Sequence, residues 1–211
     1  MVLITELPVR HGNVPMRFAH GHFATNHSHI NYYIDITYPK TRLSEAKAVA
    51  KQLVANFVYD TPVDTVLCLD GTTVIGTCLA DELTKSGFQS MNKHKTIYVI
   101  EPEYNSNSQM IFRDNIQPMI HDKHVLVLMA SCTTGYTAGK GFEAIGYYGG
   151  KVVGVAAMYS AMDELGGYPV RSVYNLKDFP DYASYDYRDC PYCKAGVKLD
   201  ALVNSHGYSS I

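Results

Sequence analysis

The sequence lacks a charge imbalance. Its 211 residues contain 18 Lys and Arg against 20 Asp and Glu, a formal net charge of -2, and the two signs are interspersed along the chain. The chain therefore has neither the strongly basic face that indicates nucleic-acid binding nor the polybasic run that indicates a membrane surface. We expect its partners among small molecules and other protein chains.

Long apolar runs are absent as well. No segment reaches the length of a membrane span, and residues 1–13 lack the basic start and long apolar stretch of a signal peptide. The five cysteines are an odd number, and Cys68, Cys78 and Cys132 lie in apolar or tight-turn segments, so reduced thiols fit better than a disulfide framework. These absences predict a cytoplasmic protein.

What the chain does have is a hydrophobic content of 46%, in a length sufficient for one substantial core. We expect a single domain over residues 1–211. It divides into an N-terminal segment at 1–40, a core at 41–177 and an irregular tail at 178–211 that carries a Cys-x-x-Cys turn.

Short apolar runs alternate with helical patterns through the core. Strands are predicted at 30–38 (ended by Pro39), 65–71, 96–102, 124–130 and 151–161, and helices at 41–58 (with Thr41 or Ser44 as its cap), 74–87 and 137–150. Continuous apolar strands separated by helices indicate a parallel sheet covered on both faces, so the fold class is α/β. Residues 102–120 are polar and turn-prone, which predicts a long loop or mobile hairpin of the kind that serves as a lid.

The stretch MASCTTGYTAGKG, residues 129–141, leaves an apolar strand, turns through small and hydroxyl residues and enters a predicted helix. Successive backbone N–H groups, threonine hydroxyls and the positive end of the helix can together wrap a phosphate at such a turn. Gly135 permits the positive φ or close approach that the wrap requires. A Thr-rich turn can also simply cap a helix. The similar turn LDGTTVIG, residues 69–76, favours the anion site, because two such turns suit a ligand with two phosphate groups.

Three motifs, in order along the chain, resemble the type I phosphoribosyltransferases and most of all the orotate phosphoribosyltransferases. HVLVLMASCTTGYT (124–137) resembles the phosphoribosyl pyrophosphate loop, FATNHSHINYYID (23–35) resembles the N-terminal segment, and DCPYCKAGVKL (189–199) resembles the Cys-Pro-x-Cys-x-x-Gly tail of some bacterial members. The resemblance implies a type I phosphoribosyltransferase-like fold, with a central, mostly parallel sheet flanked by helices and a small hood. It also implies a homodimer.

The resemblance implies roles for individual residues. The 5-phosphate of a ribose phosphate would be held by Thr133, Thr134, Gly135, Tyr136 and Thr137. The pyrophosphate loop would consist of Asp70, Gly71, Thr72 and Thr73. Candidates for substrate binding are His29, at a position where family members often carry lysine, together with Tyr32, Tyr33 and Arg113.

The chain departs from the family at two places. The paired acids that hold the ribose hydroxyls, directly or through magnesium, fall at Met129 and Ala130. A charge-assisted hydrogen bond contributes about 1.5–3 kcal/mol, so two missing contacts weaken ribose binding by roughly two to four orders of magnitude. Magnesium prefers carboxylate and phosphate oxygens, which puts the magnesium cofactor of the family in question. The stretch matching the cationic catalytic loop carries Glu101 and a single cation, Arg113.

Two functions stay open. The first is an orotate phosphoribosyltransferase-like protein of nucleotide metabolism that binds a phosphoribosyl or nucleotide ligand, and that is a glycosyltransferase if it transfers from phosphoribosyl pyrophosphate to a base. The second is a non-catalytic nucleotide or phosphate sensor that uses the same pocket. No catalytic residue is assigned.

Histidines and cysteines outside these motifs raise the question of a metal. His20 and His22, like His27 and His29, form a His-x-His pair, and Cys190 and Cys193 have the spacing of a zinc knuckle. A structural zinc needs four ligands, and neither group supplies them alone. We interpret the histidines as a polar loop and the cysteines as a turn with free thiols, and predict no metal site.

Overall fold

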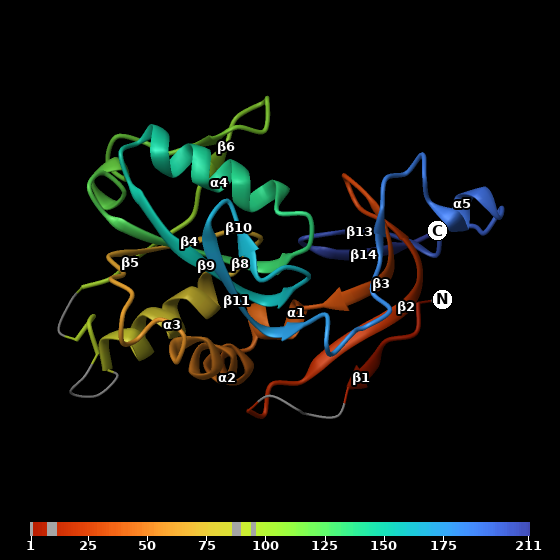
Figure 1. Cartoon of the computed structure of the whole chain (residues 1–211), viewed down its shortest axis with the longest axis horizontal. Helices are drawn as coiled ribbons and strands as arrows, with labels where there is room; N and C mark the ends of the chain where they lie inside the picture. Colours follow the sequence, from red (N-terminus) through yellow and green to blue (C-terminus); the bar gives the residue numbers. More distant parts are fainter. Residues whose placement is uncertain (1, 8–11, 86–89, 94–95) are drawn as a thin grey trace.

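A mostly parallel six-stranded sheet forms the centre of the α/β core (Figure 1). The computed structural model describes residues 2–7, 12–85, 90–93 and 96–211. The strand order is β10-β11-β9-β8-β4-β5, and of these strands β10 alone runs antiparallel to its neighbour. The strands are β4 (Thr65–Cys68), β5 (Tyr98–Ile100), β8 (His124–Cys132), β9 (Lys151–Ser160), β10 (Glu164–Leu165) and β11 (Tyr168–Asn175). The predicted α/β class is confirmed.

Helices cover both faces of this sheet. The helices of the described residues are α1 (Thr37–Thr41), α2 (Leu43–Val54), α3 (Thr73–Lys85), α4 (Tyr136–Tyr147) and α5 (Pro191–Lys194), of which α5 lies in the hood, and a 3-10 turn η1 spans Gln117–Met119. In Figure 1, α2 and α3 lie below the sheet and α4 lies above it. The predicted helix over 74–87 corresponds to α3, and residues 86–87 of that prediction lie outside the described residues.

Strand β8 divides its side chains between the two cores, as the alternation of a strand requires. Val127 and Met129 belong to the apolar cluster on the α4 side. Leu128 and Ala130 belong to the cluster that contains the buried faces of α2 and α3. The two positions that match the paired acids of the family therefore face opposite sides of the sheet.

The predicted cap of the first sequence-predicted helix, which corresponds to α2, is wrong. Its buried face follows the predicted spacing, but the N-cap residue is Arg42, and it makes no side-chain cap hydrogen bond. Thr41 belongs instead to α1, where its hydroxyl donates to the carbonyl of Thr37. Pro39, predicted to end a strand, lies in the first turn of α1, where a missing N–H leaves no intrahelical bond unmade.

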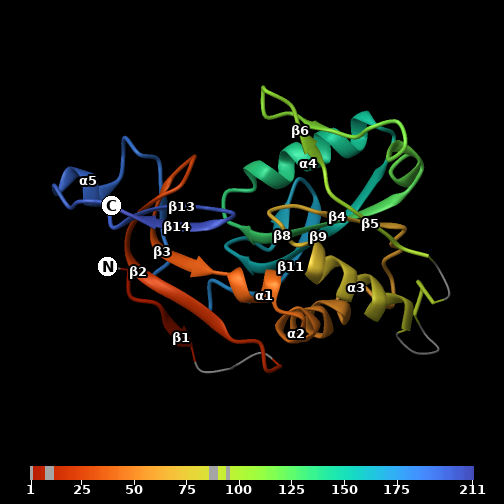
Figure 2. The same cartoon turned by 180° about the vertical axis from the view of Figure 1, so that it is seen from behind.

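A second sheet forms the hood at one end of the molecule, and it carries both chain termini (Figure 2). Its order is β12-β3-β2-β13-β14, and β1 also pairs with β2. The strands are β1 (Thr5–Leu7), β2 (Met16–Ala24), β3 (His29–Asp35), β12 (Ser184–Tyr185), β13 (Ala201–Asn204) and β14 (Gly207–Ser210). The prediction of an irregular tail is therefore wrong for 201–210. Strand β13 forms by parallel pairing with β2, a distant partner that no local pattern in the tail reveals.

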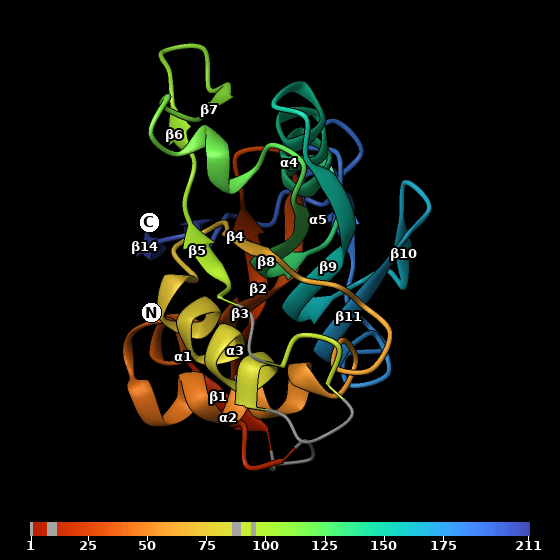
Figure 3. The same ribbon diagram turned by 90° about the vertical axis from the view of Figure 1, so that its left-hand side faces the viewer.

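The polar stretch 102–120, predicted as a long loop or a hairpin, contains a short hairpin in its first half. Strands β6 (Glu103–Tyr104) and β7 (Met110–Ile111) pair antiparallel and project beyond the sheet on the side of α4 (Figure 3). Within the described residues, no helix combines the length and apolar character needed to cross a membrane.

Candidate functional site

The strand order of the core reverses between β4 and β8. The chain passes from β4 outward to β5, returns to β8, and then continues in the other direction to β9 and β11. In open α/β sheets, ligands bind beyond the carboxyl ends of the strands at such a point. Asp70 follows β4 at this point, and the turn 133–135 follows β8.

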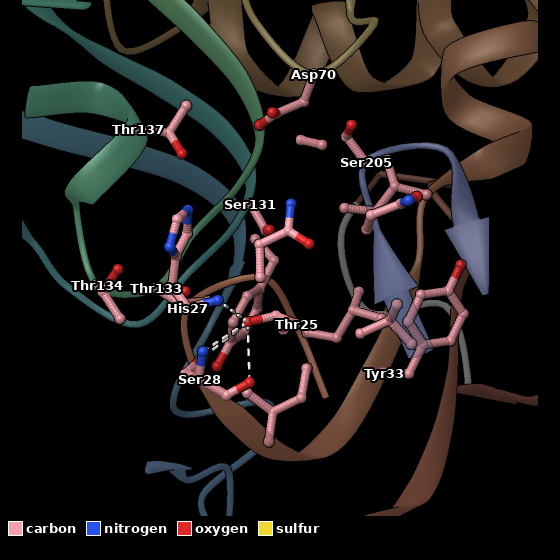
Figure 4. A pocket seen from close by; sticks show the side chains of 18 of the residues that line it. Thr25, His27, Ser28, Tyr33, Asp70, Ser131, Thr133, Thr134, Thr137 and Ser205 are labelled. Carbon is pink, nitrogen blue, oxygen red and sulfur yellow. Dashed lines mark hydrogen bonds between the residues drawn. The ribbon is translucent and has the colours of Figure 1, made fainter. Parts of the chain in front are cut away.

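A cavity of about 260 Å³ lies between these turns and the hood. Its core wall consists of Lys40, Asp70, Ala130, Ser131, Thr133, Thr134, Tyr136, Thr137 and Tyr159, and Tyr182 of the tail lines it from the hood side. Its hood wall comes from residues 25–28, 30, 32–34, 36–37 and 203–205, with Gly207. Figure 4 shows Thr133, Thr134 and Thr137 along one side, with Asp70 and Ser205 at another.

The turn before α4 has the geometry of an anion site. Its N-cap residue is Gly135, with φ of 74°, which has no side chain to cap the helix, and the Thr134 hydroxyl accepts only a long bond of 3.5 Å from the Tyr136 N–H. The first N–H groups of a helix have no intrahelical acceptor and carry a partial positive charge, so they favour an anion. Four of the five predicted phosphate-binding residues, Thr133, Thr134, Tyr136 and Thr137, line the cavity beside them.

A partly buried tyrosine, Tyr182, supports this turn from the hood side. The hydroxyls of Thr133 and Tyr182 are hydrogen bonded, and both residues line the cavity. Burial raises the pKa of Tyr182 to about 12, and the Thr133 hydrogen bond opposes the shift. Tyr182 therefore keeps its proton at neutral pH and presents no negative charge to a phosphate.

Lys40, in α1, connects the turn after β4 with the tail segment of the hood wall. Its Nζ donates to the carbonyl oxygen of Asp70 at 3.0 Å and to the carbonyl oxygen of Ser205. Burial lowers the pKa of Lys40, and the carboxylates of Asp70 and Asp35 oppose that shift. The sequence analysis missed Lys40, because it follows Pro39 at an expected strand end and belongs to no motif.

Asp70 occupies a strained and partly buried position in the same wall. Its φ is 56°, in the left-handed region that aspartate tolerates better than most residues. Burial raises the pKa of its carboxyl, while Lys40 and the backbone N–H of Ala130 oppose the rise. Asp70 thus combines a constrained backbone with a carboxylate beside a cation, which is the kind of arrangement found at ligand sites.

The other residues of the predicted pyrophosphate loop do not line the cavity. Gly71 is exposed. Thr72 is fully buried, and its hydroxyl donates to the carbonyl oxygens of Leu69 at 2.8 Å and Leu128 at 3.1 Å. The hydroxyl of Thr73 donates to the carboxylate of Glu101. Both threonine hydroxyls are therefore already engaged by protein acceptors.

The four substrate-binding candidates separate into two pairs. Tyr32 and Tyr33 line the cavity. Burial raises the pKa of Tyr33, and the neighbouring carboxylate of Asp35 adds to the rise. Arg113 lies on the β6–β7 hairpin, where Nε and Nη2 pair with Glu103 at 2.6 and 2.9 Å. His29 lies outside the cavity wall, in contact with His22.

His27, two residues before His29, faces the cavity instead (Figure 4). Its backbone N–H donates to the Thr25 hydroxyl at 3.1 Å, and the Ser28 N–H donates to the same oxygen at 2.9 Å. These bonds shape the turn between β2 and β3 so that its polar side chains reach the cavity. The His-x-His spacing was a signal for both histidines, but it could not tell which one faces the ligand.

The wall does not fit the magnesium that the family resemblance implies. Met129 is 3% exposed and packs in the core beneath α4, while Ala130 presents a methyl group to the cavity. Among the described lining residues, Asp70 carries the sole carboxylate. Magnesium prefers oxygen ligands in near-ideal octahedral geometry, and the two positions of the acid pair supply none.

None of the protein-family models and none of the curated protein sequences matches this chain. Solved structures do. The structure of Leishmania donovani UMP synthase is similar with a TM-score of 0.56 and 16% identity, over 85% of this chain and 36% of that chain. This chain therefore spans little more than a third of the length of that protein.

Two adenine phosphoribosyltransferases are also similar. The Trypanosoma brucei protein, in complex with AMP, pyrophosphate and ribose-5-phosphate, has a TM-score of 0.50 and 12% identity, over 76% of this chain and 74% of that chain. The Thermoanaerobacter pseudethanolicus protein has a TM-score of 0.50 and 16% identity, over 68% of this chain and 88% of that chain. The chain therefore has the type I phosphoribosyltransferase-like fold that its motifs predict.

Proposed function

We propose that this chain is a phosphoribosyltransferase-like protein of nucleotide metabolism whose cavity binds a phosphoribosyl or nucleotide ligand. The observation that carries the proposal is the N-terminus of α4 at the cavity wall. Uncapped helix N–H groups lie there beside the hydroxyls of Thr133, Thr134 and Thr137. A phosphate accepts hydrogen bonds from both kinds of donor, and the helix dipole favours its charge.

The rest of the cavity suits the remainder of such a ligand. Ser131 and Asp70 lie between the phosphate turn and the hood, where their oxygens can meet ribose hydroxyls. The rings of Tyr32, Tyr33 and Tyr182 line the part toward the hood and offer apolar faces to a flat base. We take orotate as the first base to test, because residues 23–35 resemble the orotate phosphoribosyltransferases and Lys40 offers a cation for its carboxylate.

A second candidate is a non-catalytic nucleotide or phosphate sensor. Transfer from phosphoribosyl pyrophosphate needs positive charge where the leaving pyrophosphate develops negative charge. Here Glu101 accepts a hydrogen bond from Thr73, on the loop that would hold the pyrophosphate. Met129 and Ala130 offer no oxygen to the ribose or to a metal. These observations favour binding over transfer.

The test is calorimetric titration with phosphoribosyl pyrophosphate, ribose 5-phosphate and orotidine monophosphate, each with and without magnesium. In the Thr134→Val variant, the affinity for ribose 5-phosphate should fall roughly tenfold to a hundredfold, because a hydrogen bond to a charged group is lost. Thr77→Val is the matched control, since the Thr77 hydroxyl donates within α3 to the Thr73 carbonyl at 2.9 Å.

A pyrophosphate-release assay separates the two candidates. Release with orotate supports the transferase, whereas tight binding of ribose 5-phosphate without release supports the sensor. If none of the phosphorylated ligands binds, both candidates are wrong. The homodimer that the resemblance implies belongs to the same proposal, and size-exclusion chromatography with light scattering measures it.

A further inference from the structure

Two histidines and two cysteines from distant parts of the chain meet in the hood, outside the cavity wall. His22 belongs to β2 and His29 begins β3, while Cys190 precedes α5 and Cys193 lies in it. The Nε2 atom of His22, the Nδ1 atom of His29 and the two Sγ atoms all lie within 4.8 Å of one another. The sequence separates these residues into two incomplete groups, and the fold joins them.

A bulge in β2 turns His22 toward the cluster. The register of β2 against β3 shifts between His20 and Phe23, so the alternation of side chains is broken there. His20 is exposed, whereas His22 is 1% exposed. Asp200 holds the bulge, because its Oδ2 accepts from the His22 N–H at 2.8 Å. A Cβ on Gly21 would lie 2.5 Å from that oxygen, so a larger residue there would displace the carboxylate that holds the bulge.

The hydrogen bonding of His22 shows which of its two ring nitrogens carries the free lone pair, and that nitrogen, Nε2, points into the cluster. Its Nδ1 lies 3.0 Å from the carbonyl oxygen of Val197. A carbonyl only accepts, so Nδ1 carries the proton and Nε2 of the neutral ring is a bare acceptor. Around Nε2 lie His29 Nδ1 at 3.1 Å, Cys190 Sγ at 3.4 Å and Cys193 Sγ at 3.7 Å. One lone pair cannot satisfy three donors, but a cation can bind all four atoms.

The distances fit tetrahedral coordination. A zinc ion with bonds of about 2.05 Å to nitrogen and about 2.3 Å to sulfur places two nitrogens about 3.3 Å apart, and a nitrogen and a sulfur about 3.6 Å apart. The nitrogen pair lies at 3.1 Å, three of the four nitrogen–sulfur pairs lie at 3.3, 3.4 and 3.7 Å, and the remaining pairs lie within 4.8 Å. The side chains are thus arranged around a single point at ligand distance.

We propose that His22, His29, Cys190 and Cys193 bind one structural zinc ion per chain. Two cysteine thiolates and two histidine imidazoles in a tetrahedral arrangement are typical of structural zinc. Oxygen ligands such as carboxylates and carbonyls would instead favour magnesium, calcium or manganese. Four protein ligands leave no open position for a substrate, so the ion is structural. The turn after α5 completes the site: Gly196, with φ of 72°, reverses the chain and lets the Val197 carbonyl reach His22.

The ion ties the cavity wall together. His22 and His29 stand on either side of the turn whose residues Thr25, His27 and Ser28 line the cavity. Cys190 and Cys193 precede the segment 203–205, which lines the cavity from the tail. Removing the ion should therefore loosen both hood segments at once, whatever ligand the cavity binds.

The test begins with elemental analysis of the full chain, purified in zinc-supplemented, chelator-free buffer without a metal-binding tag. The wild-type protein should contain one zinc ion per chain, and Cys193→Ser and His29→Gln should each lose most of it. The matched controls are Cys78→Ala, which removes a thiol in α3, and His20→Gln, which replaces an exposed histidine of β2, the strand that carries His22. Both controls should keep their zinc.

Spectroscopy and chelation keep the proposal testable if a variant fails to fold. Cobalt in place of zinc should give the visible bands of a tetrahedral site and a thiolate charge-transfer band. Chelation of the wild-type protein should lower the unfolding temperature, and added zinc should restore it. Substoichiometric zinc in the wild-type protein, wild-type zinc content in both Cys193→Ser and His29→Gln, or a Cys190–Cys193 disulfide in the freshly purified protein would overturn the proposal.

Discussion

Two glycines four residues apart should respond to the same substitution in opposite directions. Gly135 caps α4 with φ of 74°, a conformation that costs an alanine about 1–2 kcal/mol. A Cβ there would also lie 2.5 Å from Leu165 Cδ1, the movable end of a flexible side chain, so the backbone cost dominates. Gly139 lies within α4, and a Cβ there meets nothing within 4 Å. Alanine is favoured over glycine in a helix by about 0.8–1 kcal/mol.

Thermal unfolding measures both effects. A change of 1 kcal/mol shifts the melting temperature of a domain of this size by about 2–4 °C, so Gly135→Ala should lower it by about 2–8 °C and Gly139→Ala should raise it by about 2–4 °C. Titration with ribose 5-phosphate adds a second readout, because Gly135→Ala displaces the amides of the anion turn while Gly139→Ala leaves them in place. Equal shifts of the same sign, or unchanged affinity in Gly135→Ala, would refute the assignment of this turn as a phosphate site.

Three further predictions concern charge and protonation. Glu45→Gln should lower the free energy of unfolding in urea by about 2–3 kcal/mol, because the nearly buried guanidinium of Arg17, 2.9 Å from Glu45 Oε2, loses its main partner. Lys85→Gln, which removes an exposed pair, should leave the urea midpoint unchanged. Burial raises the pKa of Cys68 to about 12, above its unfolded value of about 8.5. The neutral thiol is therefore favoured in the folded state, and its contribution to the free energy of unfolding is full below pH ~8.5 and is lost as the pH rises toward 12. The urea midpoint of wild type should therefore fall more steeply between pH 9 and 11 than that of Cys68→Ala, and parallel curves would contradict this. Lys40→Met should weaken phosphate-ligand binding roughly tenfold by titration, through the loss of the cation in the wall, and unchanged affinity would exclude contact with the ligand.

The core could be predicted from the sequence because its signals are local. Residues 125–130 are continuously apolar, and they belong to β8 in the middle of the sheet. The Thr133–Thr137 turn follows directly, so its place at the carboxyl end of a strand follows from the order of residues alone. The periodic face of 43–54 likewise needs no partner to be recognised as a helix.

What sequence reasoning could not predict depends on contacts between distant segments. His22 and Cys190 are joined by the pairing of β2 with the tail and by a bulge that one glycine permits. Lys40 reaches the cavity because α1 turns the chain after β3, and no periodicity marks a helix of five residues. The Thr72 hydroxyl, expected at a ligand, satisfies two backbone carbonyls instead.

The parallel pairing of β13 with β2 also has a consequence for biosynthesis. Strands β13 and β14, which complete the hood, are synthesised after the whole α/β core, whereas β2 is synthesised before it. The α/β core can fold during translation, since its strands and helices are contiguous in the chain. Until β13 is synthesised, the backbone groups of β2 that later pair with β13 have no strand partner. The tail side of the ligand cavity therefore forms only after β13 has been synthesised, and until then the open edge of β2 can pair with other chains.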